Sequence, residues 1–191
     1  MPSADKSNCV IVKVGGSLYD LPDLRSRLGR FLASLESSSV LIVPGGGALA
    51  DAVRNIDECQ ELGEEAAHWL ALRTLTVAAH FVSALLPGSA IVDHPKEWQP
   101  GSLAVLDPYA FARCDQGRAG ELPHCWSVTS DSIAARVAHV ANVRRLVLLK
   151  SLKIPPGSAW TEAARRGWVD AHFPEAVGNL RVQTVDLQAL Q

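Results

Sequence analysis

The sequence predicts an α/β protein with three layers, in which a mostly parallel sheet lies between two layers of helices. Three observations predict it. The apolar runs are short and β-branched without polar alternation, segments with helical spacing separate them, and several runs end in glycine. The chain has 191 residues, of which 48% are hydrophobic, so it can bury a sizeable core. No linker or repeat divides it, and we expect a single domain over residues 1–191.

Strands are predicted wherever a short apolar run is closed by glycine, proline or a polar turn. The run Cys9–Val14 ends in two glycines, and Val40–Val43 ends in a proline and three glycines. Arg145–Lys150 contains the most apolar run of all. Shorter or weaker strands are predicted at Ser89–Val92, Leu103–Leu106 and Leu180–Leu187.

Helices are predicted between these strands because apolar residues recur there every three or four positions. The longest spans Glu64–Leu86 and is stopped by a Pro-Gly pair. Another begins at Thr129–Asp131 and runs through residue 140. Further helices are predicted at Pro22–Leu35, Ala48–Cys59, Pro108–Cys114 and Trp160–Arg166.

Composition excludes several classes of function. Eighteen Lys and Arg against 20 Asp and Glu give a net charge of −2, which argues against a nucleic-acid-binding surface. The most apolar stretch, residues 66–86, is broken by His68, Arg73 and His80, so we expect a buried helix and no membrane partner. The polar N-terminus resembles no secretory signal and predicts a cytoplasmic protein. The four cysteines lack zinc-site spacing, and no metal ligands are predicted.

Four segments are expected to bring polar groups to one edge of the sheet, because ligands bind beyond the carboxyl ends of parallel strands. These groups are Lys13 with Gly15, Gly16 and Ser17; Gly45, Gly46 and Gly47; Thr129, Ser130 and Asp131; and Lys150. Glycine lets the backbone approach a phosphate, helix N-termini attract anions, and lysines add charge. These glycines, helix N-termini and lysines together suit phosphoryl transfer, which depends mainly on positioning and charge stabilisation. Each part also has a purely structural interpretation: a tight turn for the glycines, a helix cap for Asp131, and a lysine leaving the sheet at Lys13 or Lys150.

Two other phosphate-binding motifs are disfavoured. No G-x-x-x-x-G-K-[ST] sequence occurs, which excludes a P-loop. Residues 45–50 fit the loose pattern G-x-G-x-x-[GA] of dinucleotide-binding proteins, but they follow the second strand. The acidic residue that should end a strand about 20 positions later is also missing.

Three segments together resemble the ordered signatures of the amino acid kinase superfamily, which includes aspartate, acetylglutamate, uridylate and isopentenyl phosphate kinases. They are residues 12–17 (VKVGGS), 42–47 (IVPGGG) and 128–135 (VTSDSIAA). Residues 67–71 and 126–131 are most similar to a small branch that contains the aminomethylfuran phosphate kinase of methanofuran biosynthesis. The resemblance implies the amino acid kinase (carbamate kinase-like) fold, and it implies ATP with Mg²⁺ as cofactors.

The resemblance also implies roles for the edge residues. Lys13 would bridge the transferring phosphoryl group, while Gly15, Gly16 and Ser17 would hold nucleotide phosphates. Gly45, Gly46 and Gly47 would bind the anionic end of the acceptor, and Thr129 and Ser130 would bind acceptor or nucleotide. Asp131 would orient the lysines. The expected reaction is ATP-dependent phosphorylation of a small phosphate or carboxylate acceptor, such as aminomethylfuran phosphate in one-carbon cofactor biosynthesis.

The chain departs from the family after the strand that ends at Lys150. Typical members carry a D-x-[DG]-G-V-like stretch and a longer nucleotide-binding region, whereas here the sequence is short and reads KSLKIPPG. Lys150 is the candidate for the family's second lysine. This difference keeps two alternatives open: a non-catalytic nucleotide or anion binder of the same fold, and a uridylate-type nucleotide kinase.

The longest helix raises two further expectations. It is apolar on more than one face, which predicts a homo-oligomer, at least a dimer. Its residues His68 and Trp69 have two interpretations, as packing residues or as substrate contacts.

Overall fold

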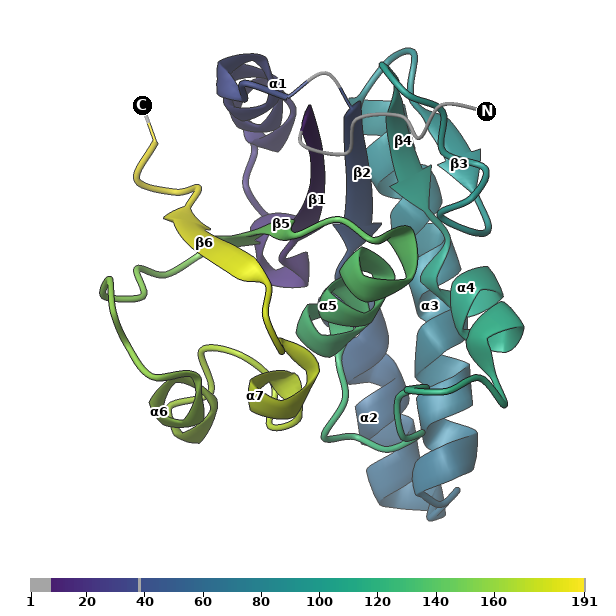
Figure 1. Cartoon of the computed structure of the whole chain (residues 1–191). Helices are drawn as coiled ribbons and strands as arrows, with labels where there is room; N and C mark the ends of the chain where they lie inside the picture. Colours follow the sequence, from purple (N-terminus) through teal and green to yellow (C-terminus); the bar gives the residue numbers. More distant parts are fainter. Residues whose placement is uncertain (1–7, 38, 191) are drawn as a thin grey trace.

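The computed structural model describes residues 8–37 and 39–190 and folds them around one six-stranded sheet (Figure 1). Every pair of neighbouring strands is parallel, so the predicted α/β sheet is confirmed. The strand order is β3-β4-β2-β1-β5-β6. The strands are β1 (Cys9–Val14), β2 (Ser39–Pro44), β3 (Ala90–Val92), β4 (Leu103–Leu106), β5 (Arg145–Lys150) and β6 (Arg181–Asp186).

The helices lie close to their predicted positions. They are α1 (Leu24–Ser34), α2 (Ala48–Gln60), α3 (Glu64–Leu85), α4 (Pro108–Asp115), α5 (Ser130–Ala141), α6 (Trp160–Arg165) and α7 (Phe173–Ala176). The sequence analysis did not predict α7 or the 3₁₀ turn η2 (Gly16–Leu18), because three or four residues are too few to show a periodic apolar pattern. Among the described residues, no helix is both long and apolar enough to cross a membrane.

Both faces of the sheet are buried, which explains why the strands lack polar alternation. Successive side chains of a strand point to opposite faces. Ile11 of β1 packs in a cluster with residues of α5, whereas Val10 and Val12 pack in a second cluster with residues of α1. Figure 1 shows α5 against one face of the sheet and α1 toward the other. The predicted three-layer arrangement is therefore present.

The same alternation determines where the two strand-end lysines point. Lys13 lies two positions after Ile11, and Lys150 lies two positions after Leu148; both of these apolar residues belong to the cluster on the α5 face. The lysines must therefore leave their strands toward α5. Because β1 and β5 are neighbours, with Lys13 paired to Leu148, the lysines converge above adjacent strands.

The chain changes direction at the boundary between β1 and β5. After β1 it builds the β2, β4 and β3 side of the sheet, and after β4 it crosses to build β5 and β6 on the other side. A crevice forms beyond the carboxyl ends of the strands at such a switch point, because the connections depart to opposite sides. Topology alone thus places a ligand site at the ends of β1 and β5.

A carboxylate distant in sequence fixes the start of α5. Asp170, between α6 and α7, accepts hydrogen bonds from the backbone N–H and hydroxyl of Thr129 and the backbone N–H of Ser132, at 2.9–3.0 Å. The Ser132 hydroxyl donates to the other carboxylate oxygen of Asp170 at 2.5 Å. Asp170 therefore satisfies N–H groups that the first turn of a helix leaves unpaired, and it holds the turn that contains Asp131.

We expect Asp170→Ala to lower the free energy of unfolding by about 2–3 kcal/mol, because it leaves several donors unpaired at the start of α5. Urea denaturation followed by circular dichroism measures this loss. Asp20→Ala is the matched control at an exposed position, where a change within about 0.5 kcal/mol is expected. Equal unfolding free energies for the two variants would show that Asp170 does not hold α5.

Candidate phosphoryl-transfer site

Lys13, Asp131 and Lys150 form a buried ionic cluster at the switch point. The Lys13 Nζ lies 3.0 Å from Asp131 Oδ1, and the Lys150 Nζ donates to Asp131 Oδ2 at 2.6 Å. All three residues are at least 92% buried. The sequence prediction that Asp131 lies within ion-pair distance of these lysines is confirmed, and one carboxylate contacts both.

The electrostatics of this cluster follow from two ammonium groups sharing one carboxylate. Burial alone would raise the pKa of Asp131, but the adjacent charges of Lys13 and Lys150 outweigh it and leave that pKa below its usual value. Burial and repulsion by Lys13 lower the pKa of Lys150 to about 8, although Asp131 opposes the shift. With both lysines protonated, the cluster carries one net positive charge, which favours an anion nearby.

The glycine loops after β1 and β2 lie in direct contact beside this cluster. A Cβ on Gly16 would lie 2.1 Å from the backbone nitrogen of Gly47, closer than atoms can approach. Gly47 also has a φ of 53°, a conformation that favours glycine. Only glycine therefore allows the two loops to pack together. The sequence prediction that both loops share one edge of the sheet is confirmed.

Backbone donors in the two loops have different roles. The N–H of Gly15 donates to Leu149 O at 2.9 Å, and the N–H of Gly45 donates to Val14 O at 2.8 Å, so both are committed to the sheet. Gly46 and Gly47 precede α2, whose first N–H groups are those that a helix leaves unpaired and that bind anions. The donors that remain for a phosphate come from the start of α2 rather than from Gly15 and Gly45.

The remaining predicted site residues also lie at this edge. The Ser17 hydroxyl is 2.8 Å from that of Ser151 and links the loops after β1 and β5. Ser130 is buried, and its Oγ would lie 3.2 Å from a Cβ built on Gly45. The Thr129 hydroxyl donates to Asp170, so its role in the structure is to anchor α5.

A cavity extends from Gly46 between α2, α3 and the start of α5. Gly46, Ala50 and Arg54 are spaced four residues apart and line one side, while Thr129 and Ser130 lie at the α5 end. Its other lining is mostly apolar and includes Ala71, Leu72, Leu75, Val128 and Ile133. The Arg54 guanidinium lies 4.2 Å from the centre of the Trp126 ring, which fixes a positive charge in the wall.

A second cavity runs along β6 and the segment between β5 and α6. It is lined by Lys153, Pro155, Ser158, Trp160, Thr184 and Asp186, among others. Asp186, at one end of this cavity, pairs with Lys150 in the sheet register. The short segment after Lys150, which departs from the family pattern, thus still borders a hollow surface.

Sequence reasoning missed several residues of this region. Asp170, Arg54, Trp126 and His124 were not identified as site residues, because each reaches its position through tertiary contacts that no local pattern encodes. Arg54 had one detectable signal: it lies at helical spacing from the glycine loop that was identified.

Among residues 8–37 and 39–190, no group of three or more His, Cys, Asp or Glu side chains converges as metal ligands. Both oxygens of Asp131 face ammonium groups. These residues do not fit a protein-held Mg²⁺ site of their own.

No known protein-family model matches the chain. Among curated proteins, the [5-(aminomethyl)furan-3-yl]methyl phosphate kinase of Methanocaldococcus jannaschii is 27% identical over 142 residues, which cover 72% of this chain and 63% of that protein. The chain therefore matches less than two thirds of the length of this curated relative.

Solved structures of uridylate (UMP) kinases have a similar fold. The enzyme of Archaeoglobus fulgidus superposes with a TM-score of 0.64 at 14% identity, covering 93% of this chain and 90% of that one. The enzyme of Ureaplasma parvum superposes with a TM-score of 0.63 at 11% identity, covering 95% of this chain and 90% of that one. The enzyme of Bacillus anthracis superposes with a TM-score of 0.62 at 12% identity, covering 95% of this chain and 88% of that one. The chain therefore has the amino acid kinase fold, and the resemblance that its three motifs predict is confirmed.

Proposed function

We propose that the protein is a kinase that transfers the γ-phosphoryl group of ATP to a small anionic acceptor, a phosphate monoester. The observation that carries this proposal is the pair of buried lysines held by Asp131 at the switch point. Phosphoryl transfer depends mainly on positioning and charge stabilisation, and a preorganised pair of ammonium groups supplies both.

The proposed reaction balances without a general base. An oxygen of the acceptor phosphate attacks the γ-phosphorus of ATP and forms a new P–O–P linkage. The bond between the γ-phosphorus and the β–γ bridging oxygen breaks, and ADP leaves with its electron pair. A phosphate monoester with a second pKa near 6 is already largely ionised at pH 7, so no proton need be removed.

This proposal assigns a role to each part of the cluster. Lys13 and Lys150 stabilise the negative charge on the transferring group, while Asp131 keeps both ammonium groups fixed and protonated. Asp131 is therefore a positioning residue and not a base. The N–H groups at the start of α2 bind the acceptor phosphate, and Gly16 and Ser17 contact the nucleotide phosphates.

We place the nucleotide and the acceptor on opposite sides of the lysine cluster. The cavity along β6 includes Asp186, the sheet neighbour of Lys150, and suits the base and ribose of ATP, with Trp160 for stacking. The cavity along α2 begins at Gly46 and carries Arg54, which suits an acceptor phosphate.

The acceptor we favour is aminomethylfuran phosphate, as in methanofuran biosynthesis, because the curated relative is named for that substrate. UMP is the alternative that the structural neighbours raise. The middle of the acceptor cavity is apolar, where two ribose hydroxyl groups would lose hydrogen bonds to water. The apolar lining therefore favours an acceptor whose ring carries no hydroxyl groups over a nucleoside.

Mg²⁺ belongs to this proposal as the ion that ATP brings with it. The described side chains do not form a cage for it, so the nucleotide phosphates and water would supply its ligands. A single domain over residues 1–191 and a cytoplasmic location remain predictions.

We also propose that the protein is a homo-oligomer, at least a dimer. Leu70, Val77 and Phe81 lie along one stripe of α3 and are 38–56% exposed. A second copy that covers this stripe would remove it from water. We expect sedimentation equilibrium at micromolar concentration to give at least twice the mass of the chain; a strictly monomeric mass would contradict the proposal.

We expect Lys13→Met to lower turnover by about 10²- to 10³-fold, because the transition state loses one preorganised positive charge. Folding should persist, since Asp131 keeps Lys150. A coupled assay for ADP with aminomethylfuran phosphate or UMP as acceptor measures the effect, and Lys96→Met is the control at an exposed lysine.

Unchanged turnover in Lys13→Met would remove Lys13 from the mechanism. If the wild-type protein binds ATP but phosphorylates no acceptor, the non-catalytic alternative replaces the kinase.

A further inference from the structure

Two histidines lie next to the acceptor cavity and take no part in the proposed phosphoryl transfer. His68 of α3 and His124, in the segment between α4 and α5, have ring centres 5.5 Å apart. The Trp69 ring packs against the His124 ring, and the two ring centres are 4.3 Å apart. The acceptor cavity adjoins a hollow that contains His124, because four residues line both spaces: His68, Leu72, Val128 and Ile133.

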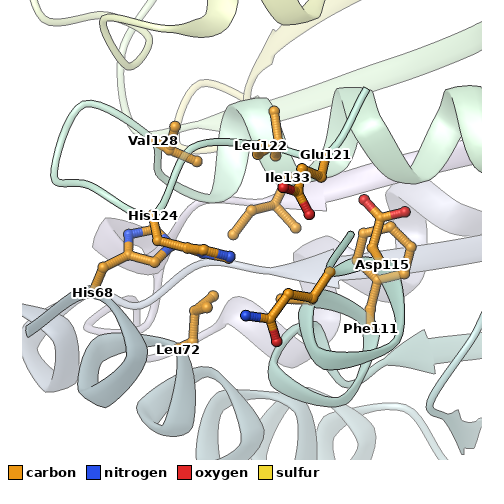
Figure 2. A pocket seen from close by; sticks show the side chains of 11 residues that line it. His68, Leu72, Phe111, Asp115, Glu121, Leu122, His124, Val128 and Ile133 are labelled. Carbon is orange, nitrogen blue, oxygen red and sulfur yellow. The ribbon is translucent and has the colours of Figure 1, made fainter. Parts of the chain in front are cut away.

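His124 has unsatisfied hydrogen-bonding groups. Both ring nitrogens are buried, and neither has a hydrogen-bond partner within the described part of the chain. An imidazole carries one N–H donor and one lone pair, and leaving them unpaired in a buried place costs free energy. Figure 2 shows His124 beside His68, with Leu72 and Ile133 lining the space next to them. A ligand group that reaches this space would supply the missing partner.

The charges around this hollow indicate which group that would be. Glu121 and Asp115 lie on its far side (Figure 2). Asp115 accepts two hydrogen bonds from Arg136, at 2.7 and 2.9 Å, and Glu121, which is exposed, accepts a hydrogen bond from the backbone N–H of Gly117. The described residues that line the hollow thus include two carboxylates and no lysine or arginine, which disfavours a carboxylate or phosphate there and favours a cation.

His68 adds no positive charge to oppose a cation. Burial and the neighbouring His124 lower the pKa of His68 to about 4, so its ring is neutral at pH 7. Its ring also hydrogen-bonds the backbone of Cys125, which fixes it where the two spaces meet.

We propose that this hollow is the subsite for a protonated amine at the end of the acceptor opposite its phosphate, and that His124 accepts a hydrogen bond from that amine. Such an acceptor has the two ends of the substrate for which the curated relative is named, a phosphate ester and an aminomethyl group on one ring. The phosphate lies at Gly46 and the ring lies between Leu72 and Ile133. This inference rests on the proposed kinase function and assigns His124 as a specificity-determining residue.

The test compares three acceptors: aminomethylfuran phosphate, the analogue in which a methyl group replaces the aminomethyl group, and UMP. The wild-type protein should prefer the amine by about 10- to 100-fold in kcat/KM, because a hydrogen bond to a charged group is lost with the analogue. His124→Phe keeps a ring against Trp69 but removes both nitrogens, and it should bring the ratio to within about threefold of one.

His80→Phe is the matched control, since His80 is exposed on α3 and lines neither cavity; its ratio should equal that of the wild type. His124→Gln, which restores an oxygen acceptor, should recover part of the preference and replaces the Phe variant if that variant does not fold.

Equal use of the amine and its methyl analogue by the wild type, or an unchanged ratio in His124→Phe, would overturn the amine subsite while the kinase stands. Preference for UMP with no effect of His124→Phe would also overturn it. Transfer to none of the three acceptors would overturn the kinase function and this inference together.

Discussion

The structure depends on one buried carboxylate that neutralises only half of the charge around it. Removing two ammonium groups from water costs several kcal/mol for each ion unless a partner compensates. Asp131 contacts both Lys13 and Lys150, which leaves one excess positive charge at the ends of two central strands. Burial and repulsion by Lys13 hold the pKa of Lys150 below its usual value, although Asp131 opposes the shift. In the reaction that we propose, a phosphoryl group that enters the crevice would complete the compensation.

The rest of the fold holds this cluster in place. Parallel pairing of β1 with β5 brings the lysines together, and the two-residue side-chain repeat points both toward α5. Asp170 fixes the first turn of α5, and therefore the position of Asp131, from a loop about 40 residues farther along the chain. The contact between Gly16 and Gly47 leaves the start of α2 open beside the cluster. Each of these features positions either the lysine cluster or the start of α2 beside it.

The parts that the sequence predicted are those in which local pattern determines structure. Unbroken apolar runs indicated buried parallel strands, and the glycines after β1 and β2 indicated close backbone approach. Lys13, Asp131 and Lys150 could be grouped because strand ends share one edge of such a sheet. Asp170, Arg54 and His124 could not be grouped, because their positions depend on the packing of loops and helices. The backbone bonds of Gly15 and Gly45 were likewise invisible, since a glycine that joins the sheet and one that binds a phosphate look alike in sequence.

The pH dependence of kcat/KM in the wild type and in Asp131→Asn tests the central claim most directly, because kcat/KM reports the ionisation of the free protein. The wild-type profile should fall above about pH 8 as Lys150 loses its proton. In Asp131→Asn, the loss of the carboxylate charge lowers the pKa of Lys150 further, so the alkaline limb moves to lower pH. Turnover drops about 100-fold or more, and no new acidic limb appears. An Asp131→Asn profile that matches the wild type in both height and position would contradict the claim that one carboxylate holds two catalytic lysines.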